Sequence, residues 1–374
     1  MLRLLKDAGA NVQVATGFIE PSILSQIGNT YSVSVTPYLD RSYQGLEGDA
    51  LIRRIVDSIY EKAKDSNLLL FSQPFSGDAP HFAEAVAEVA LGTSAESWHR
   101  SHDPIRLPHN FTVLKGLTRA LPTTNILSRQ MREINPDVKI VVVPPCIDED
   151  RLNNVLELPE VLRQRHNIGN NDILLVQPTR VDPNKRIDKA IELAVRMEED
   201  LARRGNKRKV HLIVSGGESS EKSRSEQQRL ELLAKKSGFG NLFFLGGTER
   251  VADYIRAADF VTFMSEQEGW GMPPAEAAYL GVPCVVAPYT DQYGQPIFQE
   301  VYGGFDFIVD DNKGKTISQS TVDRAIDLVT DLSMGDQLRL NNKLKVARYT
   351  KGAMKETLDL LLRQHQNRGL AKTT

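Results

Sequence analysis

Two glutamates, Glu268 and Glu276, stand with seven residues between them and enclose a Gly-x-Gly turn. Carboxylate oxygens accept hydrogen bonds from adjacent hydroxyl groups, so such a pair is suited to orienting a polyhydroxylated ligand. Residues 260–264 form a short apolar run, and Pro273 and Pro274 stand where the first turn of a helix would begin. The sequence predicts a strand, a glycine loop and a helix, with Glu268 at the loop mouth and Glu276 in the first helical turn.

The backbone of this loop is a second candidate ligand group. In the predicted geometry the amides of Gly269, Trp270, Gly271 and Met272 have no intrahelical acceptors, so they can bind an anion or sugar hydroxyls. A plainer interpretation stays open, because the helix dipole alone favours glutamate in a first turn and Gly-x-Gly is common in turns.

A second predicted strand, residues 173–179, leads into a turn that carries Arg180 and Lys185 before a periodic apolar helix begins at Ile187. A guanidinium offers a planar fork and an ammonium a point charge, and two such cations match a diphosphate. The alternative is a solvated basic pair at a helix start. Cations oppose the dipole at that end of a helix, which favours the interpretation that an anion binds there.

Together these residues resemble the family 4 retaining glycosyltransferases of GT-B fold. The family phrase S-x-x-E-G-F-G-L-P-x-x-E-A-x-x-x-G-x-P-V corresponds up to its last proline to residues 265–283, which read S-E-Q-E-G-W-G-M-P-P-A-E-A-A-Y-L-G-V-P, and the family's Arg and Lys, five residues apart, correspond to Arg180 and Lys185. The resemblance is clear over most of residues 165–345 and loose before them. It implies an α/β architecture of two Rossmann-like, doubly wound parallel-sheet domains facing a central cleft.

The resemblance also implies an activity, a hexosyltransferase that moves a sugar from a nucleotide-diphosphate donor, of GDP-mannose or UDP-glucose type, to a hydroxyl acceptor. Glu268 would contact sugar hydroxyls, Glu276 the ribose, and Arg180, Lys185 and the loop amides the leaving diphosphate. The acceptor would be a carbohydrate, a glycolipid or a small hydroxyl compound. The anomeric configuration would be retained, and no metal or other cofactor would be needed.

Two further features resemble family elements. His102, within Ser-His-Asp at residues 101–103, is the candidate for sugar contact from the N-terminal half, with His99 and His109 as substitutes. A surface turn is the alternative there, because the residues before it are too polar for a convincing buried strand. Gly216 and Gly217 follow a predicted strand and resemble the glycine loop near the donor nucleotide, although a tight turn also accounts for them.

Composition limits the other function classes. The chain has 374 residues with 46 basic and 48 acidic side chains, which argues against nucleic-acid binding. Two distant cysteines, Cys146 and Cys284, in strand-like apolar runs argue for buried free thiols rather than disulfides or zinc. The sequence shows neither a leader pattern nor an apolar run near eighteen residues, so we expect a cytoplasmic protein, with a peripheral membrane contact left open.

Short apolar runs alternate with helical segments, a pattern typical of doubly wound sheets. We expect an acceptor-side domain over residues 1–150, a donor domain over 165–345, and a terminal segment, 346–374, whose helix packs back across the domains. The predicted strands of the first domain are residues 12–16, 32–37, 68–71, 125–127 and 139–143. Those of the second are residues 173–177, 210–215, 242–245, 260–264, 283–287 and 305–309.

The start of the chain departs from the family pattern. Residues 2–9 have the periodicity of an amphipathic helix, whereas a GT-B enzyme opens with a strand and a glycine loop. The sequence therefore predicts that the first strand and loop are missing. This keeps an inactive sugar-nucleotide-binding or scaffold protein open as an alternative, beside a GT-B epimerase or phosphorylase. Asp148 and Asp150 have metal-ligand spacing, but their context argues against a metal site.

Overall fold

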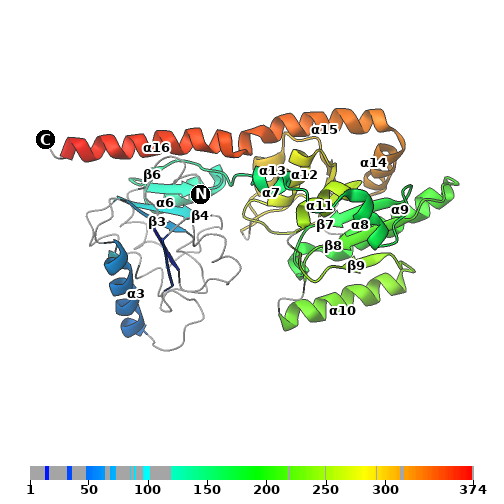
Figure 1. Ribbon diagram of the computed structural model, residues 1–374, viewed down its shortest axis with the longest axis horizontal. Helices are drawn as coiled ribbons and strands as arrows, with labels where there is room; N and C mark the ends of the chain where they lie inside the picture. The colour runs from blue at the N-terminus through cyan, green and yellow to red at the C-terminus, as the bar shows by residue number, and fades with distance from the viewer. Residues whose placement is uncertain are drawn as a thin grey trace. The chain divides into compact units, whose positions relative to one another are not determined.

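The computed structural model describes residues 13–16, 32–35, 48–63, 68–72, 85, 88–89, 96–101, 119–217, 220–248, 250–291, 293–311 and 316–372. The chain divides into two compact units, one of residues 1–144 and 352–374 and the other of residues 145–351. Each unit is an α/β structure with parallel strands (Figure 1). The helix predicted over residues 2–9 lies outside the described residues.

The first unit contains two parallel sheets. Strands β1 (Gln13–Thr16) and β2 (Ser32–Val35) pair with each other, and the second sheet has the order β3-β4-β5-β6. Its strands are β3 (Leu68–Ser72), β4 (Glu96–Ser101), β5 (Arg119–Pro122) and β6 (Lys139–Ile140). The helices of this unit include α3 (Gly48–Ala63) and α6 (Asn125–Ile134), and α16 (Lys351–Lys372) belongs to it from residue 352 onward.

One predicted strand of this unit is wrong. Residues 125–127 begin helix α6, because Thr124 caps it by accepting a hydrogen bond from the Leu127 amide at 3.1 Å. The apolar residues there, Ile126, Leu127 and Met131, share one buried helical face. The strand lies just upstream as β5, whose four residues are all buried. Three apolar residues in a short window fit either element, and the cap decides between them.

Residues 96–101 are too polar to predict a buried strand, yet they form strand β4. Strand β4 pairs in parallel with β3 on one side and β5 on the other, for example through Trp98, which lies opposite Leu70 and Arg119. Ser97 and Trp98 are fully buried, and the Arg119 guanidinium lies 4.9 Å from the centre of the Trp98 ring. Pairing on both edges satisfies the backbone, and one large aromatic residue supplies apolar contact that the rest of the segment lacks.

The second unit has a six-stranded parallel sheet of order β12-β11-β10-β7-β8-β9. Its strands are β7 (Ile173–Gln177), β8 (Val210–Val214), β9 (Leu242–Phe244), β10 (Phe260–Phe263), β11 (Cys284–Val286) and β12 (Ile308–Val309). The first three strands run outward from β7 and the last three outward from β10. The order therefore reverses between β7 and β10, and ligands of open α/β sheets bind at such a reversal, beyond the carboxyl ends of the strands.

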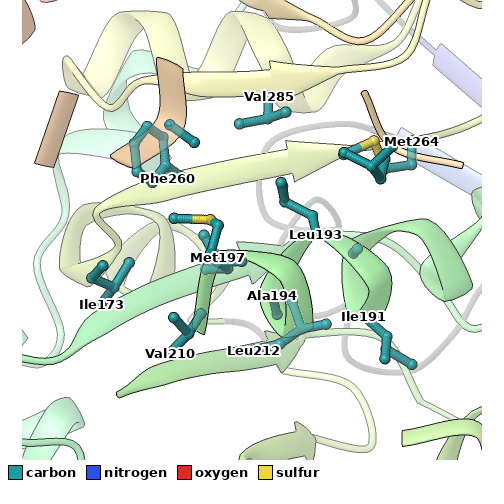
Figure 2. Close-up of a cluster of buried hydrophobic side chains, with 14 of the residues drawn as sticks. Ile173, Ile191, Leu193, Ala194, Met197, Val210, Leu212, Phe260, Met264 and Val285 are labelled. Carbon is teal, nitrogen blue, oxygen red and sulfur yellow. The ribbon is translucent and has the colours of Figure 1, made fainter. Parts of the chain in front are cut away.

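Helices cover both faces of this sheet. The larger core lies under α9, whose Met197 lies among Ile173, Val210 and Phe260 of the strands (Figure 2). On the opposite face, Leu162 of α8 and Tyr254 of α11 pack against Leu174 and Ile213. The near-continuous apolar runs of β7 and β8 follow from burial on both faces.

The remaining helices complete the second unit and the connection out of it. They are α7 (Glu149–Asn153), α8 (Pro159–Arg165), α9 (Ile187–Arg203), α10 (Glu221–Lys236), α11 (Val251–Ala257), α12 (Met272–Leu280), α13 (Ile297–Tyr302), α14 (Gln319–Thr330) and α15 (Leu332–Val346), with short 3₁₀ turns at Pro183–Lys185 and Ala347–Tyr349. Among the described helices, none is long and apolar enough to cross a membrane.

The two cysteines are free thiols, but only Cys284 is fully buried, whereas Cys146 is half-buried. Burial raises the pKa of the Cys284 thiol well above its ordinary value, because a thiolate would lose its hydration there. Cys284 therefore stays protonated and acts as a small core residue.

Candidate active site

The reversal point of the six-stranded sheet brings two predicted site residues together. Lys185 follows β7 and Glu268 follows β10, and the Lys185 Nζ lies 2.5 Å from the Glu268 Oε1. Both side chains are mostly buried, with 13% and 16% of their surface exposed. The ammonium keeps two further N–H groups and the carboxylate a second oxygen, and none of these makes a hydrogen bond with the described residues. The pair can therefore offer donors and an acceptor to one ligand.

The turn after β7 has a defined shape that places Lys185. Asp182 accepts a hydrogen bond from the Asn184 amide at 2.9 Å, and a 3₁₀ turn follows at Pro183–Lys185. The Lys185 carbonyl accepts a hydrogen bond from the Gln177 side chain at 2.7 Å. Gln177 is fully buried at the end of β7, so the core fixes the backbone of the lysine.

Arg186, the residue after Lys185, is not a solvated cation at the helix start, which was the alternative interpretation of this basic turn. Its backbone is left-handed, with φ of 46°, and its guanidinium pairs with Asp188 and with Glu266. These carboxylates raise the pKa of Arg186. The adjacent cation, Lys185, is thereby the one that faces Glu268.

Asn184 joins the two loops and was missed by the sequence analysis. Its Nδ2 donates to the Gln267 carbonyl at 2.9 Å, and its Oδ1 accepts from the Gln267 amide at 3.0 Å. Its carbonyl also accepts from the Glu266 amide at 3.0 Å. On the other side, the Glu268 amide donates to the Thr290 carbonyl at 3.0 Å. The backbone on which Glu268 stands is therefore held by hydrogen bonds from two neighbouring loops.

The glycine loop after β10 is fixed by two buried tyrosines. The Tyr289 hydroxyl donates to the Trp270 carbonyl and the Tyr302 hydroxyl to the Gly271 carbonyl, each at 2.5 Å. Burial raises the pKa of both tyrosines well above the ordinary value, so both hydroxyls stay protonated and able to donate. Gly271 has φ of 80°, and a Cβ there would lie 2.5 Å from the Tyr289 oxygen. Only glycine fits this position without a rearrangement.

Trp270 has a structural side chain. Only 4% of its surface is exposed, and it packs edge-on against Tyr302 and Tyr349 at ring-centre distances of 5.4 and 4.9 Å. Only the backbone of Trp270 therefore remains a candidate for ligand contact, together with the backbones of Gly269, Gly271 and Met272.

Glu276 lies one residue beyond the place that the sequence predicted. Helix α12 begins at Met272, with a proline in its first positions, and has no acidic residue in its first turn. Glu276 is 8% exposed and its Oε1 pairs with the Arg151 guanidinium. Burial raises the pKa of Glu276 above its ordinary value of 4.5, and the charge of Arg151 opposes that rise. Arg151 comes from α7, and no sequence motif indicated it.

Gly216 and Gly217 are required by close backbone packing. A Cβ on Gly216 would lie 2.2 Å from the Arg180 Cα, and one on Gly217 would lie 2.2 Å from the carbonyl group of Gly246. The Gly216 amide also donates to the Thr179 carbonyl at 3.0 Å. The two glycines therefore let the loops after β7, β8 and β9 converge at the carboxyl edge of the sheet.

Arg180 is separate from the lysine–glutamate pair in its contacts. It lines a pocket of about 210 Å³ with Val181, Asp182, Ser220, Lys222 and Ser223, at the start of α10. Neither Arg180 nor Lys222 makes an ion pair with the described residues, so this pocket carries two cations with unused hydrogen-bonding capacity. Lys222 is a cation that the sequence analysis had not assigned.

Two buried hydroxyls lie at the same reversal point. Thr179 Oγ1, beyond β7, and Ser265 Oγ, beyond β10, have no hydrogen-bond partner among the described residues. Buried polar atoms of native proteins are nearly always paired, so these two indicate where water or a ligand completes the site.

Two further groups were noted in the sequence, the histidines of the N-terminal half and an acidic pair. His102 and His109 lie outside the described residues, and His99 belongs to β4, where it pairs with Phe71 and Ala120. Asp148 and Asp150 each lie 2.7 Å from the Lys351 Nζ, so an ammonium already occupies the space between them. Within the described ranges no cluster of metal-ligating side chains was found.

Residues 160–345 match the sequence profile of glycosyl transferases group 1. This segment contains β7 to β12, the Lys185–Glu268 pair and Glu276. The chain carries a group 1 glycosyltransferase domain. The predicted resemblance to family 4-like glycosyltransferases is confirmed, and the solved structures described below confirm the GT-B fold. Retention and the role of each site residue remain predictions.

Two curated proteins are similar to this domain. A D-inositol 3-phosphate glycosyltransferase of Geodermatophilus obscurus is 30% identical over 152 residues, which cover 40% of this chain and 33% of that protein. The lipopolysaccharide glucosyltransferase WaaG of Escherichia coli is 26% identical over 181 residues, covering 48% and 42%. The chain thus matches less than half the length of either relative.

Solved structures share the fold over nearly the whole chain. A glycosyltransferase from Rickettsia africae has a TM-score of 0.78 at 13% identity and covers 98% of this chain and 93% of its own. Anabaena Alr3699/HepE, solved with UDP and glucose, has a TM-score of 0.70 at 14% identity and covers 97% and 94%. At these identities the likeness establishes the fold.

Proposed function

We propose that this protein is a retaining glycosyltransferase that moves a hexose from a nucleotide-diphosphate sugar to a hydroxyl acceptor. The observation that carries the proposal is the Lys185–Glu268 pair, which joins the loops after β7 and β10 at the reversal point of a group 1 domain. An ammonium and a carboxylate held together there suit a ligand that is a phosphate at one end and a polyol at the other.

Lys185 and Arg180 take the charge of the leaving diphosphate. When the bond from the anomeric carbon to the diphosphate oxygen breaks, negative charge grows on that oxygen, and preorganised cations lower the barrier most at this point. The exposed guanidinium of Arg180 and the spare N–H groups of Lys185 are available for it. Transfer then proceeds without a metal ion, since these side chains and the loop amides supply the positive charge.

The two glutamates orient the donor. Glu268 accepts hydrogen bonds from sugar hydroxyls through the oxygen that Lys185 leaves unused, and Glu276 accepts them from the ribose. The acceptor oxygen forms its bond to the anomeric carbon on the face that the diphosphate leaves. The acceptor proton passes to the departing phosphate oxygen, which gives retention without a protein nucleophile.

The donor is of UDP-glucose or GDP-mannose type. UDP is the first nucleotide to test, because the similar Anabaena structures contain UDP, UDP-glucose or UDP with glucose. The curated relatives, a D-inositol 3-phosphate glycosyltransferase and a lipopolysaccharide glucosyltransferase, suggest polyol and glycolipid hydroxyls as acceptor classes.

The proposal is tested by incubating the full chain with UDP-, GDP- and ADP-sugars and a panel of hydroxyl acceptors. Release of nucleoside diphosphate together with an α-configured product from an α-linked donor supports it. Sugar isomerisation without an acceptor would identify an epimerase, and release dependent on inorganic phosphate would identify a phosphorylase. Nucleotide binding with no turnover of any donor would identify a binding protein and overturn the proposal.

A further inference from the structure

The most informative group outside the predicted site is Arg151, the partner of Glu276. Its guanidinium donates through one nitrogen to the Glu276 Oε1, and the side chain is 40% exposed. The carboxylate is nearly buried, with 11% of the side chain exposed. Arg151 therefore reaches a recessed carboxylate from the solvent side and takes only one of its two oxygens.

The segment that carries Arg151 is itself fixed. Helix α7 has only five residues, but Leu152 is fully buried and the Leu152 carbonyl accepts a hydrogen bond from Arg256. Asn153 donates to the Tyr279 hydroxyl of α12 at 2.9 Å. Helix α7 is therefore held against α12, the helix on which Glu276 stands.

A second set of contacts ties the start of α7 to the end of this unit. The Lys351 Nζ lies 2.7 Å from both Asp148 and Asp150, and the Lys351 amide donates to Glu149 at 2.8 Å. The Ile147 amide donates to the Tyr349 carbonyl at 2.8 Å. We call these residues, 147–150 and 349–351, the α7 clasp. The clasp anchors the N-terminal end of a short helix that would be unstable alone, and it thereby fixes the backbone position of Arg151.

The geometry points to Arg151 as a positioning residue of the donor site, which holds one oxygen of Glu276 so that the other faces the ribose hydroxyls. This inference rests on the proposed function, because it takes Glu276 to be the ribose ligand. A carboxylate held by one charged hydrogen bond has a fixed plane and keeps acceptor sites on its second oxygen. Without the guanidinium, the recessed carboxylate would rotate or take up a proton, and its acceptor oxygen would be lost.

The test is the preference of the protein for ribose over deoxyribose. Binding of UDP, GDP and ADP to the full chain is measured by calorimetry, and the tightest nucleotide is then compared with its 2′-deoxy and 3′-deoxy forms. A hydrogen bond to a charged carboxylate corresponds to a preference of roughly tenfold or more, so we expect wild-type protein to discriminate by about that factor.

Variants then separate positioning from mere folding. In Arg151→Met we expect affinity for the ribonucleotide to fall about tenfold and the preference to vanish, as in Glu276→Gln. Arg151→Lys, which keeps the charge, should retain part of the preference. The double variant Arg151→Met/Glu276→Gln should match Glu276→Gln within about twofold, since the arginine acts through the glutamate. Arg203→Met removes an exposed arginine paired with Asp200 and is the matched control, with no change expected.

Three results would overturn the inference while leaving the proposed function standing. They are a wild type that binds nucleotide without a ribose preference, an Arg151→Met variant that keeps the preference, and one that binds the ribonucleotide more tightly. The last would make Arg151 a competitor for Glu276. A wild type that binds none of the nucleotides would overturn the proposed function and this inference together.

Discussion

The two glutamates of the motif each pair with a cation from another part of the chain, but the two pairs are built differently. Glu268 and Lys185 are both mostly buried and stand on loops that Asn184 joins. Glu276 is buried, whereas its partner Arg151 is 40% exposed and stands on a five-residue helix. Burial raises the pKa of Glu276. The first pair lies in the interior at the carboxyl ends of β7 and β10. The second joins a buried glutamate to a partly exposed arginine.

Two glutamates of one sequence motif can therefore have different surroundings and respond differently when their partners are removed. Breaking the interior pair leaves a charge that water cannot reach, so stability and catalysis both suffer. Removing Arg151 takes away a cation that water already reaches and leaves Glu276 in place, so the main effect falls on the protonation and orientation of that carboxylate.

The largest effect is expected at Lys185. Lys185→Ala should lower kcat/KM by about a hundredfold or more, because a preorganised cation is lost from the transition state. It should also lower the free energy of unfolding by about 3 kcal/mol, since Glu268 stays buried without a partner. Steady-state kinetics and denaturant unfolding measure the two effects.

A double variant is the control for Lys185. Lys185→Met/Glu268→Gln removes both charges, so it should recover most of the stability and none of the activity. A single variant with wild-type kcat/KM would remove Lys185 from the site. An interior pair that contributes nothing to stability would contradict the contrast with the outer one.

The loop between the two glutamates gives the next test. Gly271→Ala should lower the free energy of unfolding by more than about 2 kcal/mol, because it combines a strained φ of 80° with contact against Tyr289. Gly281, at the other end of α12, has φ of 73° but open space around its Cβ. Gly281→Ala should therefore cost only about 1 kcal/mol. Equal losses in thermal unfolding would show that the Tyr289 contact is unimportant.

The junction of the two loops is tested through Asn184. Asn184→Ala removes both hydrogen bonds to Gln267, and we expect kcat/KM to fall about tenfold as Lys185 and Glu268 lose their alignment. Asn184→Asp keeps the oxygen that accepts from the Gln267 amide and should lose less. If both variants transferred sugar at the wild-type rate, the alignment of the interior pair would not depend on this junction.

The smallest effect concerns the outer pair and pH. Because the folded-state pKa of Glu276 is raised, its contribution to stability is present below about pH 4.5 and is lost as pH rises through the folded pKa. Glu276→Gln has no such titration, so its stability relative to wild type should improve from pH 4 to pH 7. Denaturant midpoints across this range measure the trend. A relative stability that is flat or falls with pH would contradict the raised pKa.

Much of the second unit could be predicted from the sequence. All six of its strands were predicted at close to the observed positions. The four fully buried ones, β7, β8, β10 and β11, read as near-continuous apolar runs because both of their faces are covered. The first unit was harder. The central strand β4 is polar apart from Trp98, and its burial depends on partners that are distant in the chain. Segment 125–127 became a helix because a local cap outweighed an ambiguous apolar pattern.

The sequence by itself determined the elements that carry Lys185, Glu268 and Glu276, because apolar periodicity, glycines and prolines act over a few residues. Only the tertiary structure decided which charges meet. Lys185 meets Glu268 because β7 and β10 are neighbours at the reversal of strand order. Arg151 meets Glu276 from 125 residues away. Ion pairs have no sequence period, so their partners follow from the order of the strands and the packing of the helices.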